Sequence, residues 1–153
     1  MDFQLKDKVA FITGGSRGIG RAMALMFADH GANIVICGRT KESLDQTVQD
    51  LKAKGVMAWG FQTDVSRMED VERFVSDAMK AAGQVDILVN NAVTSTSAPF
   101  DQLTDDEFRY HIDVKLMAYI RIARLVLPHM KRQGSGRIVN VGGMTARIVA
   151  PLE

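Results

Sequence analysis

Short runs of apolar residues alternate along the chain with longer segments in which apolar residues recur every three or four positions. The runs cover residues 8–13, 33–37, 56–61, 85–89 and 137–141. Each has the length and composition of a strand that is buried on both faces of a parallel sheet. The longer segments, which have the spacing of amphipathic helices, are residues 18–30, 41–54, 67–82 and 104–132. This alternation predicts an α/β fold, a Rossmann-type doubly wound parallel sheet.

The predicted helices carry boundary signals of their own. Gly31, Gly55 and Gly83 follow the first three helices, and glycine readily adopts the left-handed conformation that ends a helix. Thr104 and Glu107, at the start of the last helix, have the spacing of a capping box. No linker, internal repeat or low-complexity tract interrupts the pattern, so we expect residues 1–153 to form a single domain.

Composition and charge narrow the range of functions. The 153 residues have a formal net charge of +1, so we expect no nucleic-acid partner. No apolar run is long enough to span a bilayer and the N-terminus does not resemble a secretory signal, so we expect no membrane partner and a cytoplasmic location. The single cysteine, Cys37, fits a reducing compartment and is expected to be a small buried residue. No metal site is expected.

A glycine-rich segment, TGGSRGIG, follows the first predicted strand and opens the first predicted helix. Glycine-rich segments are common in turns, but this context is the one that a nucleotide-binding loop requires. Gly14 permits a tight turn, Gly18 the close approach of the backbone to a pyrophosphate, and Gly20 the packing of the helix on the strand. The helix N-terminus attracts phosphate. The candidate cofactor-binding residues of this loop are Gly14, Gly15, Ser16, Arg17, Gly18, Ile19 and Gly20.

Arg39 determines which nucleotide we expect. Sites for NAD(H) usually have an acidic residue at the end of the second strand, where it binds the ribose hydroxyls. Here the sequence is Gly38-Arg39-Thr40, and a guanidinium suits a 2′-phosphate through paired, charge-assisted hydrogen bonds. Arg17 offers a second positive charge. We therefore expect NADP(H) rather than NAD(H); the alternative is that both arginines are only solvated surface residues.

Two more motifs follow predicted strands, Asp64-Val65 and Asn90-Asn91-Ala92, and a third motif, GRIVNV, is the fifth predicted strand itself. Together with TGGSRGIG, and in this order, they resemble the short-chain dehydrogenase/reductase family from about Asp7 onward. The resemblance implies that Asp64 bonds the adenine amino group and that Val65 packs beside the ring. It also implies that Asn90 and Ala92 shape the wall next to the adenosine ribose. Read without the resemblance, the two asparagines would only stabilise a turn.

The chemistry of this family depends on a tyrosine followed four residues later by a lysine, which places both side chains on one helix face. Tyr110 is followed at that spacing by Val114, and Tyr119 by Ala123, so the chain has no such pair. In the family the pair comes after the fifth strand, beyond Glu153. We therefore expect the N-terminal, cofactor-binding portion of such a protein, with a sheet that is incomplete at its C-terminal side. The fifth strand would then be an edge with exposed apolar surface.

Two further positions depart from the family pattern. The family has a serine after the fifth strand, where this chain has Gly143, and an asparagine in the long helix, where the resemblance places Asp113. Asp113 is the candidate catalytic residue, as a proton relay; the alternative is a polar residue on an exposed helix face. Val93 replaces the glycine of the family's NNAG sequence.

Three functions remain open. The first is an NADP(H)-dependent oxidoreductase that transfers hydride to or from a small carbonyl or alcohol substrate. The second is a non-catalytic nucleotide-binding protein, and the third is an inert fragment. We also expect a homo-oligomer through the helix of residues 104–132, as in the family. The apolar residues that would form its interface, or would instead face the protein's own sheet, are Ile112, Leu116, Ile120 and Ala123.

Overall fold

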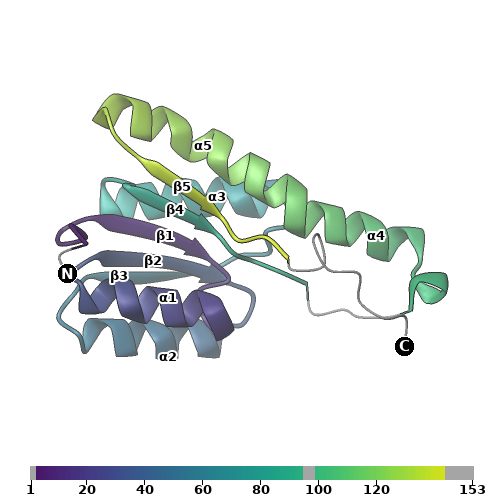
Figure 1. The fold of residues 1–153 in the computed structure, drawn as a ribbon, viewed down its shortest axis with the longest axis horizontal. Helices are drawn as coiled ribbons and strands as arrows, with labels where there is room; N and C mark the ends of the chain where they lie inside the picture. The colour runs from purple at the N-terminus through teal and green to yellow at the C-terminus, as the bar shows by residue number, and fades with distance from the viewer. Residues whose placement is uncertain (1–2, 95–98, 144–153) are drawn as a thin grey trace.

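Five parallel strands form the centre of the molecule, in the order β3-β2-β1-β4-β5 (Figure 1). The computed structural model describes residues 3–94 and 99–143. The strands are β1 (Val9–Thr13), β2 (Asn33–Gly38), β3 (Ala58–Gln62), β4 (Ile87–Asn90) and β5 (Arg137–Asn140). The chain runs outward from β1 to β3 and then crosses back to β4, so the strand order reverses between β1 and β4. In such a sheet, ligands bind at the carboxyl ends of the strands beside this reversal.

Helices cover both faces of the sheet, as the doubly wound prediction requires. The helices α1 (Gly18–Asp29) and α2 (Lys41–Lys52) lie on one side (Figure 1). The helices α3 (Met68–Ala82) and α5 (Ala118–Gln133) pack on the other. The helix α4 (Asp105–Ile112) precedes α5 and extends past the carboxyl edge of the sheet (Figure 1). The predicted α/β fold is confirmed.

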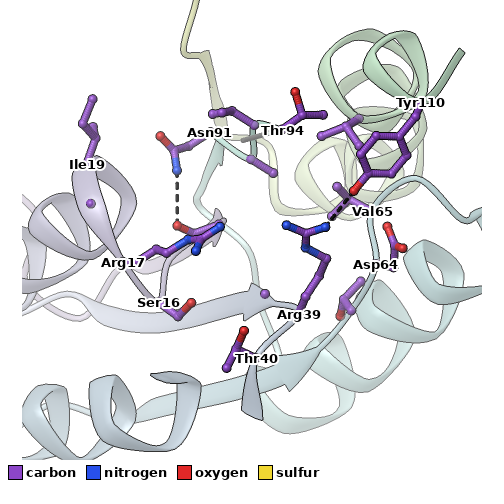
Figure 2. A pocket seen from close by; sticks show the side chains of 17 residues that line it. Ser16, Arg17, Ile19, Arg39, Thr40, Asp64, Val65, Asn91, Thr94 and Tyr110 are labelled. Atoms are coloured by element: carbon purple, nitrogen blue, oxygen red, sulfur yellow. Dashed lines mark hydrogen bonds between the residues drawn. The ribbon is translucent and has the colours of Figure 1, made fainter. Parts of the chain in front are cut away.

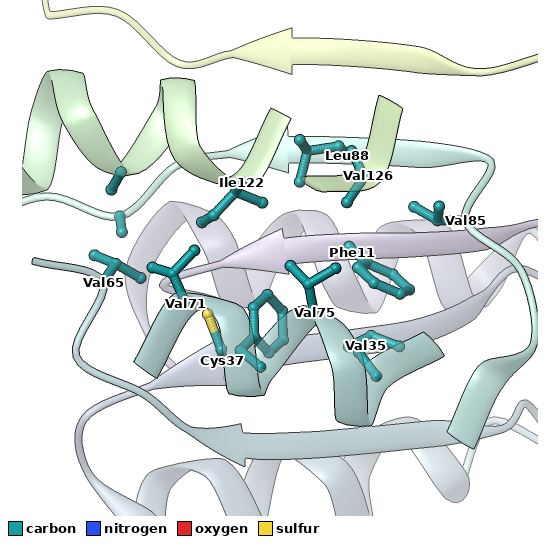
Figure 3. Close-up of a cluster of buried hydrophobic side chains, with 14 of the residues drawn as sticks. Phe11, Val35, Cys37, Val65, Val71, Val75, Val85, Leu88, Ile122 and Val126 are labelled. Atoms are coloured by element: carbon teal, nitrogen blue, oxygen red, sulfur yellow. The ribbon is translucent and has the colours of Figure 1, made fainter. Parts of the chain in front are cut away.

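The side chains of β1 explain this arrangement. All five residues are buried, and successive side chains point to opposite faces of the sheet. Ala10 and Ile12 pack with α1 and α2. Val9 and Phe11 pack with α3 and α5, and the rings of Phe11 and Phe74 lie 6.0 Å apart. Figure 3 shows this second core, in which strand residues face side chains of α3 and α5. A strand buried on both faces must be apolar throughout, which is why the run in the sequence was continuous.

The long helix predicted for residues 104–132 is interrupted. Between α4 and α5 lies a five-residue π-helical segment, Asp113–Met117, in which the Ala118 N–H donates to the Asp113 carbonyl five residues earlier. A π turn adds one residue and so changes which side chains face the sheet. The buried residues of this segment and of α5 accordingly recur at every fourth position: Val114, Ala118, Ile122, Val126 and Met130.

The helix boundaries follow the predicted signals. Gly31, Gly55 and Gly83 have φ values of +82°, +84° and +75°, the left-handed region that glycine adopts at least cost. Thr104 accepts a hydrogen bond from the Glu107 N–H, and Glu107 accepts one from the Thr104 N–H, so the predicted capping box is confirmed. Within the described ranges, no helix combines the length and the apolar character needed to cross a bilayer.

The last strand is the least buried part of the sheet. All four residues of β5 are exposed, and Ile138 and Val139 have exposed fractions of 39% and 48%. Because β5 pairs only with β4 among the described strands, its outer edge and part of both faces lie open. The predicted apolar edge at this strand is therefore present.

Cys37 is completely buried in β2, as the sequence predicts. Burial raises the pKa of its thiol to about 12, and the thiolate is the reactive form. We expect no alkylation of the folded chain by iodoacetamide at pH 8 and full alkylation in denaturant, measured by mass spectrometry. Modification of the folded chain as fast as of the unfolded chain would contradict the burial of this residue.

Candidate functional site

A cavity of about 440 Å³ lies at the carboxyl end of the sheet, where the strand order reverses (Figure 2). Its walls come from the segments that follow β1, β2, β3 and β4 and from the region of α4. The lining residues are Gly14, Ser16, Arg17, Gly18, Ile19, Gly38, Arg39, Thr40, Thr63, Asp64, Val65, Asn91, Ala92, Val93, Thr94, Tyr110 and Val114.

Two features of the glycine loop favour glycine: some of its residues have positive φ values, and others have no room for a Cβ atom. Gly14 and Gly18 have φ values of +64° and +54°, a region that L side chains rarely adopt. A Cβ on Gly20 would lie 2.2 Å from the carbonyl oxygen of Gly14, and one on Gly15 would lie 2.3 Å from Cγ2 of Ile36. The loop therefore turns tightly, and α1 packs directly against it.

The start of α1 faces the cavity. Gly18 and Ile19, the first two residues of the helix, line it together with Arg17, the residue before the helix. The first N–H groups of a helix have no partners within the helix and carry partial positive charge. This end of α1 therefore suits an anionic group such as a pyrophosphate.

Asn91 holds the glycine loop to the end of β4. Its side-chain amide donates to the carbonyl oxygens of Thr13 (3.0 Å) and Gly14 (3.3 Å). Figure 2 shows the hydrogen bond to Gly14. Its backbone N–H donates to the Thr13 hydroxyl at 2.9 Å. No cofactor contact is predicted for Asn91 from the sequence, but this side chain fixes two neighbouring walls of the cavity to one another.

Arg39 projects across the cavity from the end of β2. Its Nη1 donates to the hydroxyl of Tyr110, on α4, at 2.8 Å (Figure 2), and its backbone carbonyl accepts from the Gln62 side chain at 2.9 Å. Among the described residues, no carboxylate forms an ion pair with Arg39 or Arg17. The cavity thus has two arginines whose charge is not neutralised by any described carboxylate.

Asp64 follows β3, the strand that pairs with β2, and lines the cavity on the same side as Arg39. Its Oδ1 accepts hydrogen bonds from the backbone N–H and the hydroxyl of Ser66, while Oδ2 has no partner among the described residues. The Asp64 N–H donates to the Asp70 carboxylate, and this hydrogen bond, with a smaller contribution from Arg73, holds the pKa of Asp70 below its usual value. Val65 beside it is nearly buried. The free oxygen and the apolar neighbour form a surface to which a polar aromatic ring can bind.

Three of the predicted cofactor residues do not line the cavity. Gly15 and Gly20 lie behind it and make room for Ile36 and Gly14. Asn90 is completely buried, and its side-chain amide donates to the Asn140 side chain at 2.9 Å. These residues support the walls from behind. All of the other predicted cofactor residues line the cavity.

Asp113 lies on the π-helical segment and outside the cavity lining. Its carboxylate forms an ion pair with Arg121 at 3.2 Å, and Arg121 also donates to the carbonyl of Ser66. This position fits the alternative of a polar residue on the helix surface. A relay role for Asp113 stays a prediction.

A lysine and a tyrosine that are four residues apart do form a hydrogen bond, but the lysine precedes the tyrosine, which is the reverse of the order in the family. Lys115 Nζ donates to the Tyr119 hydroxyl and to the Val141 carbonyl, both at 2.9 Å, and the Tyr119 hydroxyl donates to the Ala92 carbonyl at 3.3 Å. Neither side chain lines the cavity. The pair fastens the long helix to the carboxyl ends of β4 and β5. The sequence signal for this contact is the spacing of four residues within one predicted helix.

Comparisons with known proteins agree with this geometry. The family model for short chain dehydrogenases matches residues 8–152. An uncharacterized oxidoreductase of Bacillus subtilis, YvrD, is 36% identical over 141 residues, which are 92% of this chain and 53% of the relative. The chain thus spans about half the length of this relative.

Solved structures are similar along almost the whole of this chain. L-sorbose reductase from Gluconobacter frateurii, complexed with NADPH and L-sorbose, has a TM-score of 0.92 at 36% identity, covering 96% of this chain and 56% of that one. A xylitol dehydrogenase with bound NAD⁺ has a TM-score of 0.90 at 29% identity, covering 97% and 58%. The family profile, the similar relatives, and the cavity with its glycine loop lead to one conclusion: the chain belongs to the short-chain dehydrogenase/reductase family.

Proposed function

We propose that this chain is the cofactor-binding portion of an NADP(H)-dependent oxidoreductase that acts on a small carbonyl or alcohol substrate. Similar proteins bind either nucleotide, NADPH in the sorbose reductase and NAD⁺ in the xylitol dehydrogenase, so family membership does not select between them. The observation that carries the proposal is Arg39. It extends into the cavity at the end of β2 with no carboxylate partner among the described residues, where an NAD(H) site would have an acid.

The residues present fit this cofactor. Gly14, Gly18 and the start of α1 leave room and N–H donors for the pyrophosphate. Asp64 and Val65 offer an acceptor and an apolar surface for the adenine. Arg39, with Arg17 as a second cation, would hold a 2′-phosphate through charge-assisted hydrogen bonds. When bound, NADP(H) supplies the hydride of the family's reaction; the residues described above bind and orient it.

A non-catalytic nucleotide-binding protein is the second candidate. It is favoured by Gly143, an exposed residue after β5 that offers no side chain where the family has a serine. It is also favoured by Asp113, which stands where the family has an asparagine. Both candidates predict nucleotide binding. For this chain by itself we propose that NADPH oxidation in the presence of carbonyl compounds does not exceed that of a heat-killed control.

Thermal unfolding with added nucleotide tests the proposed function. A ligand at 100 times its Kd stabilises the folded state by about 2.7 kcal/mol. We expect a higher Tm with NADP⁺ than with the same concentration of NAD⁺. An equal Tm with NADP⁺, with NAD⁺ and without nucleotide would support the inert fragment, and a larger increase with NAD⁺ would contradict the assigned cofactor.

We also propose that a second copy of the chain covers the outer face of α4 and α5. Ile112, Leu116 and Ile120 have exposed fractions of 51%, 54% and 40% and recur at every fourth position along this face. Ala123, in contrast, packs against the protein's own core. A stripe of this kind is unusual on a monomer.

Leu116→Glu tests this pairing, because it places a charge in the middle of the stripe. We expect sedimentation analysis to find a dimer or larger oligomer for the wild type and a monomer for the variant. Gln49→Glu, on an exposed position of α2 and therefore on the other side of the sheet, adds the same single negative charge and is the control. A monomeric wild type would contradict the pairing.

A further inference from the structure

The hydrogen bond between Arg39 and Tyr110 joins two segments that are 71 residues apart in the sequence. Figure 2 shows the two side chains pointing toward each other across the cavity, one from the end of β2 and one from α4. The Tyr110 ring is partly buried and packs against the core that includes Val114. The hydroxyl at the end of this anchored ring therefore offers Arg39 a fixed acceptor.

The partner of Arg39 carries no charge. Arg21, Arg73, Arg109 and Arg121 all form ion pairs with aspartates. Arg39 instead donates to a neutral phenol, which holds the guanidinium without cancelling its charge. A guanidinium has five N–H donors, and no described residue other than Tyr110 accepts from this one. The remaining donors are available to an anion in the cavity.

The segment that carries Tyr110 is itself held in place. The capping box of Thr104 and Glu107 fixes the start of α4. The adjacent residue, His111, forms a hydrogen bond of 2.6 Å between its Nδ1 and the hydroxyl of Thr94, which lines the cavity. Tyr110 is thus fastened through its ring, its helix and its neighbour. A tyrosine held in this way restricts the long side chain of Arg39, which would otherwise sample many rotamers.

We propose that Tyr110 is a positioning residue that sets nucleotide specificity by holding the Arg39 guanidinium in place for a 2′-phosphate. Ordering a free arginine side chain on binding costs conformational entropy. The hydrogen bond to Tyr110 orders the Arg39 side chain before the nucleotide binds, so that binding itself costs less conformational entropy. NADH has no 2′-phosphate and gains little from a positioned guanidinium, so Tyr110 discriminates between the two nucleotides. The inference rests on the proposed function.

A double-mutant cycle measured with two nucleotides tests this role. NADPH and NADH are titrated against the full chain as wild type, Tyr110→Phe, Arg39→Ala and the double variant, with nucleotide fluorescence as the readout. Loss of one neutral hydrogen bond predicts that Tyr110→Phe weakens NADPH binding about fivefold. It should weaken NADH binding less than about twofold, and in the Arg39→Ala background it should change neither affinity. Arg109→Gln, on the exposed side of α4, should leave the ratio of the two affinities unchanged.

The outcomes separate this inference from the proposed function. A wild type that does not prefer NADPH overturns both. A wild type that prefers NADPH and loses the preference with Arg39→Ala retains the proposed function. In that case, an unchanged or increased preference in Tyr110→Phe overturns the positioning role, as does an equal loss for both nucleotides. Thermal unfolding of each variant checks that the chain is folded, and the ratio of affinities within one variant is independent of the amount of active protein.

Discussion

Replacing Arg39 with aspartate is expected to weaken NADPH binding by about 100-fold, or about 2.8 kcal/mol. Hydrogen bonds to charged groups contribute about 1.5–3 kcal/mol each, and the variant loses those to the phosphate and adds a repulsive charge. NADH binding should become tighter, because an acid at this position accepts hydrogen bonds from the ribose hydroxyls. The preference between the nucleotides should therefore reverse.

Fluorescence titration of the variant with both nucleotides measures this reversal. Arg109→Asp, which makes the same charge change on a side chain that is 70% exposed, is the matched control and should keep the wild-type preference. If Arg39→Asp bound NADPH as tightly as the wild type does, the 2′-phosphate would not be recognised at the end of β2. Arg39 would then be only a solvated surface residue.

Replacing Gly20 with alanine is expected to abolish tight nucleotide binding and to destabilise the fold by about 1–3 kcal/mol, the usual cost of overpacking. Within a helix, alanine is normally more stable than glycine by about 0.5–1 kcal/mol. Here the added Cβ would lie 2.2 Å from the Gly14 oxygen and 2.5 Å from Nδ2 of Asn91. The oxygen belongs to the backbone and cannot rotate away, so the glycine loop has to move and the steric effect prevails.

The matched control is Gly55→Ala, which replaces a glycine after α2 where no atom lies within 4 Å of the added Cβ. Its positive φ makes it mildly destabilising, by about 1–2 kcal/mol, but nucleotide binding should be preserved. Chemical denaturation gives the free energy of unfolding of both variants, and titration gives their affinities. A Gly20→Ala chain with wild-type affinity for NADPH would show that the loop does not need close packing of α1.

Periodicity in the sequence was sufficient to predict the sheet and its helices, because β1, β2 and β4 are buried on both faces and α1, α2, α3 and α5 each bury one face. The cofactor loop could also be predicted, since Gly14 and Gly18 have the positive φ values that favour glycine and lie within one short segment of the sequence. Arg39 was found because its position, at the end of a strand, is determined by local structure. The structure places all three in one cavity.

The remaining features depend on how distant elements meet. The contact of Tyr110 with Arg39 follows from the extension of α4 beyond the sheet, which no local pattern encodes. The π-helical segment was not predicted because its effect, a shift in the residues that face the core, resembles ordinary helical spacing. The contact of Lys115 with Tyr119 is not predicted by the family pattern, because that pattern places the tyrosine before the lysine and this pair has the reverse order. Asn90 was expected at the cavity wall, but it faces the end of β5 instead.

Titration of the unmodified chain with NADPH and NADH is the decisive test of the proposed cofactor. We expect saturable binding of NADPH with an affinity at least about tenfold higher than that for NADH, since a phosphate held by a guanidinium gains charge-assisted hydrogen bonds. Binding of neither nucleotide, or tighter binding of NADH, would contradict the assignment of this cavity as an NADP(H) site.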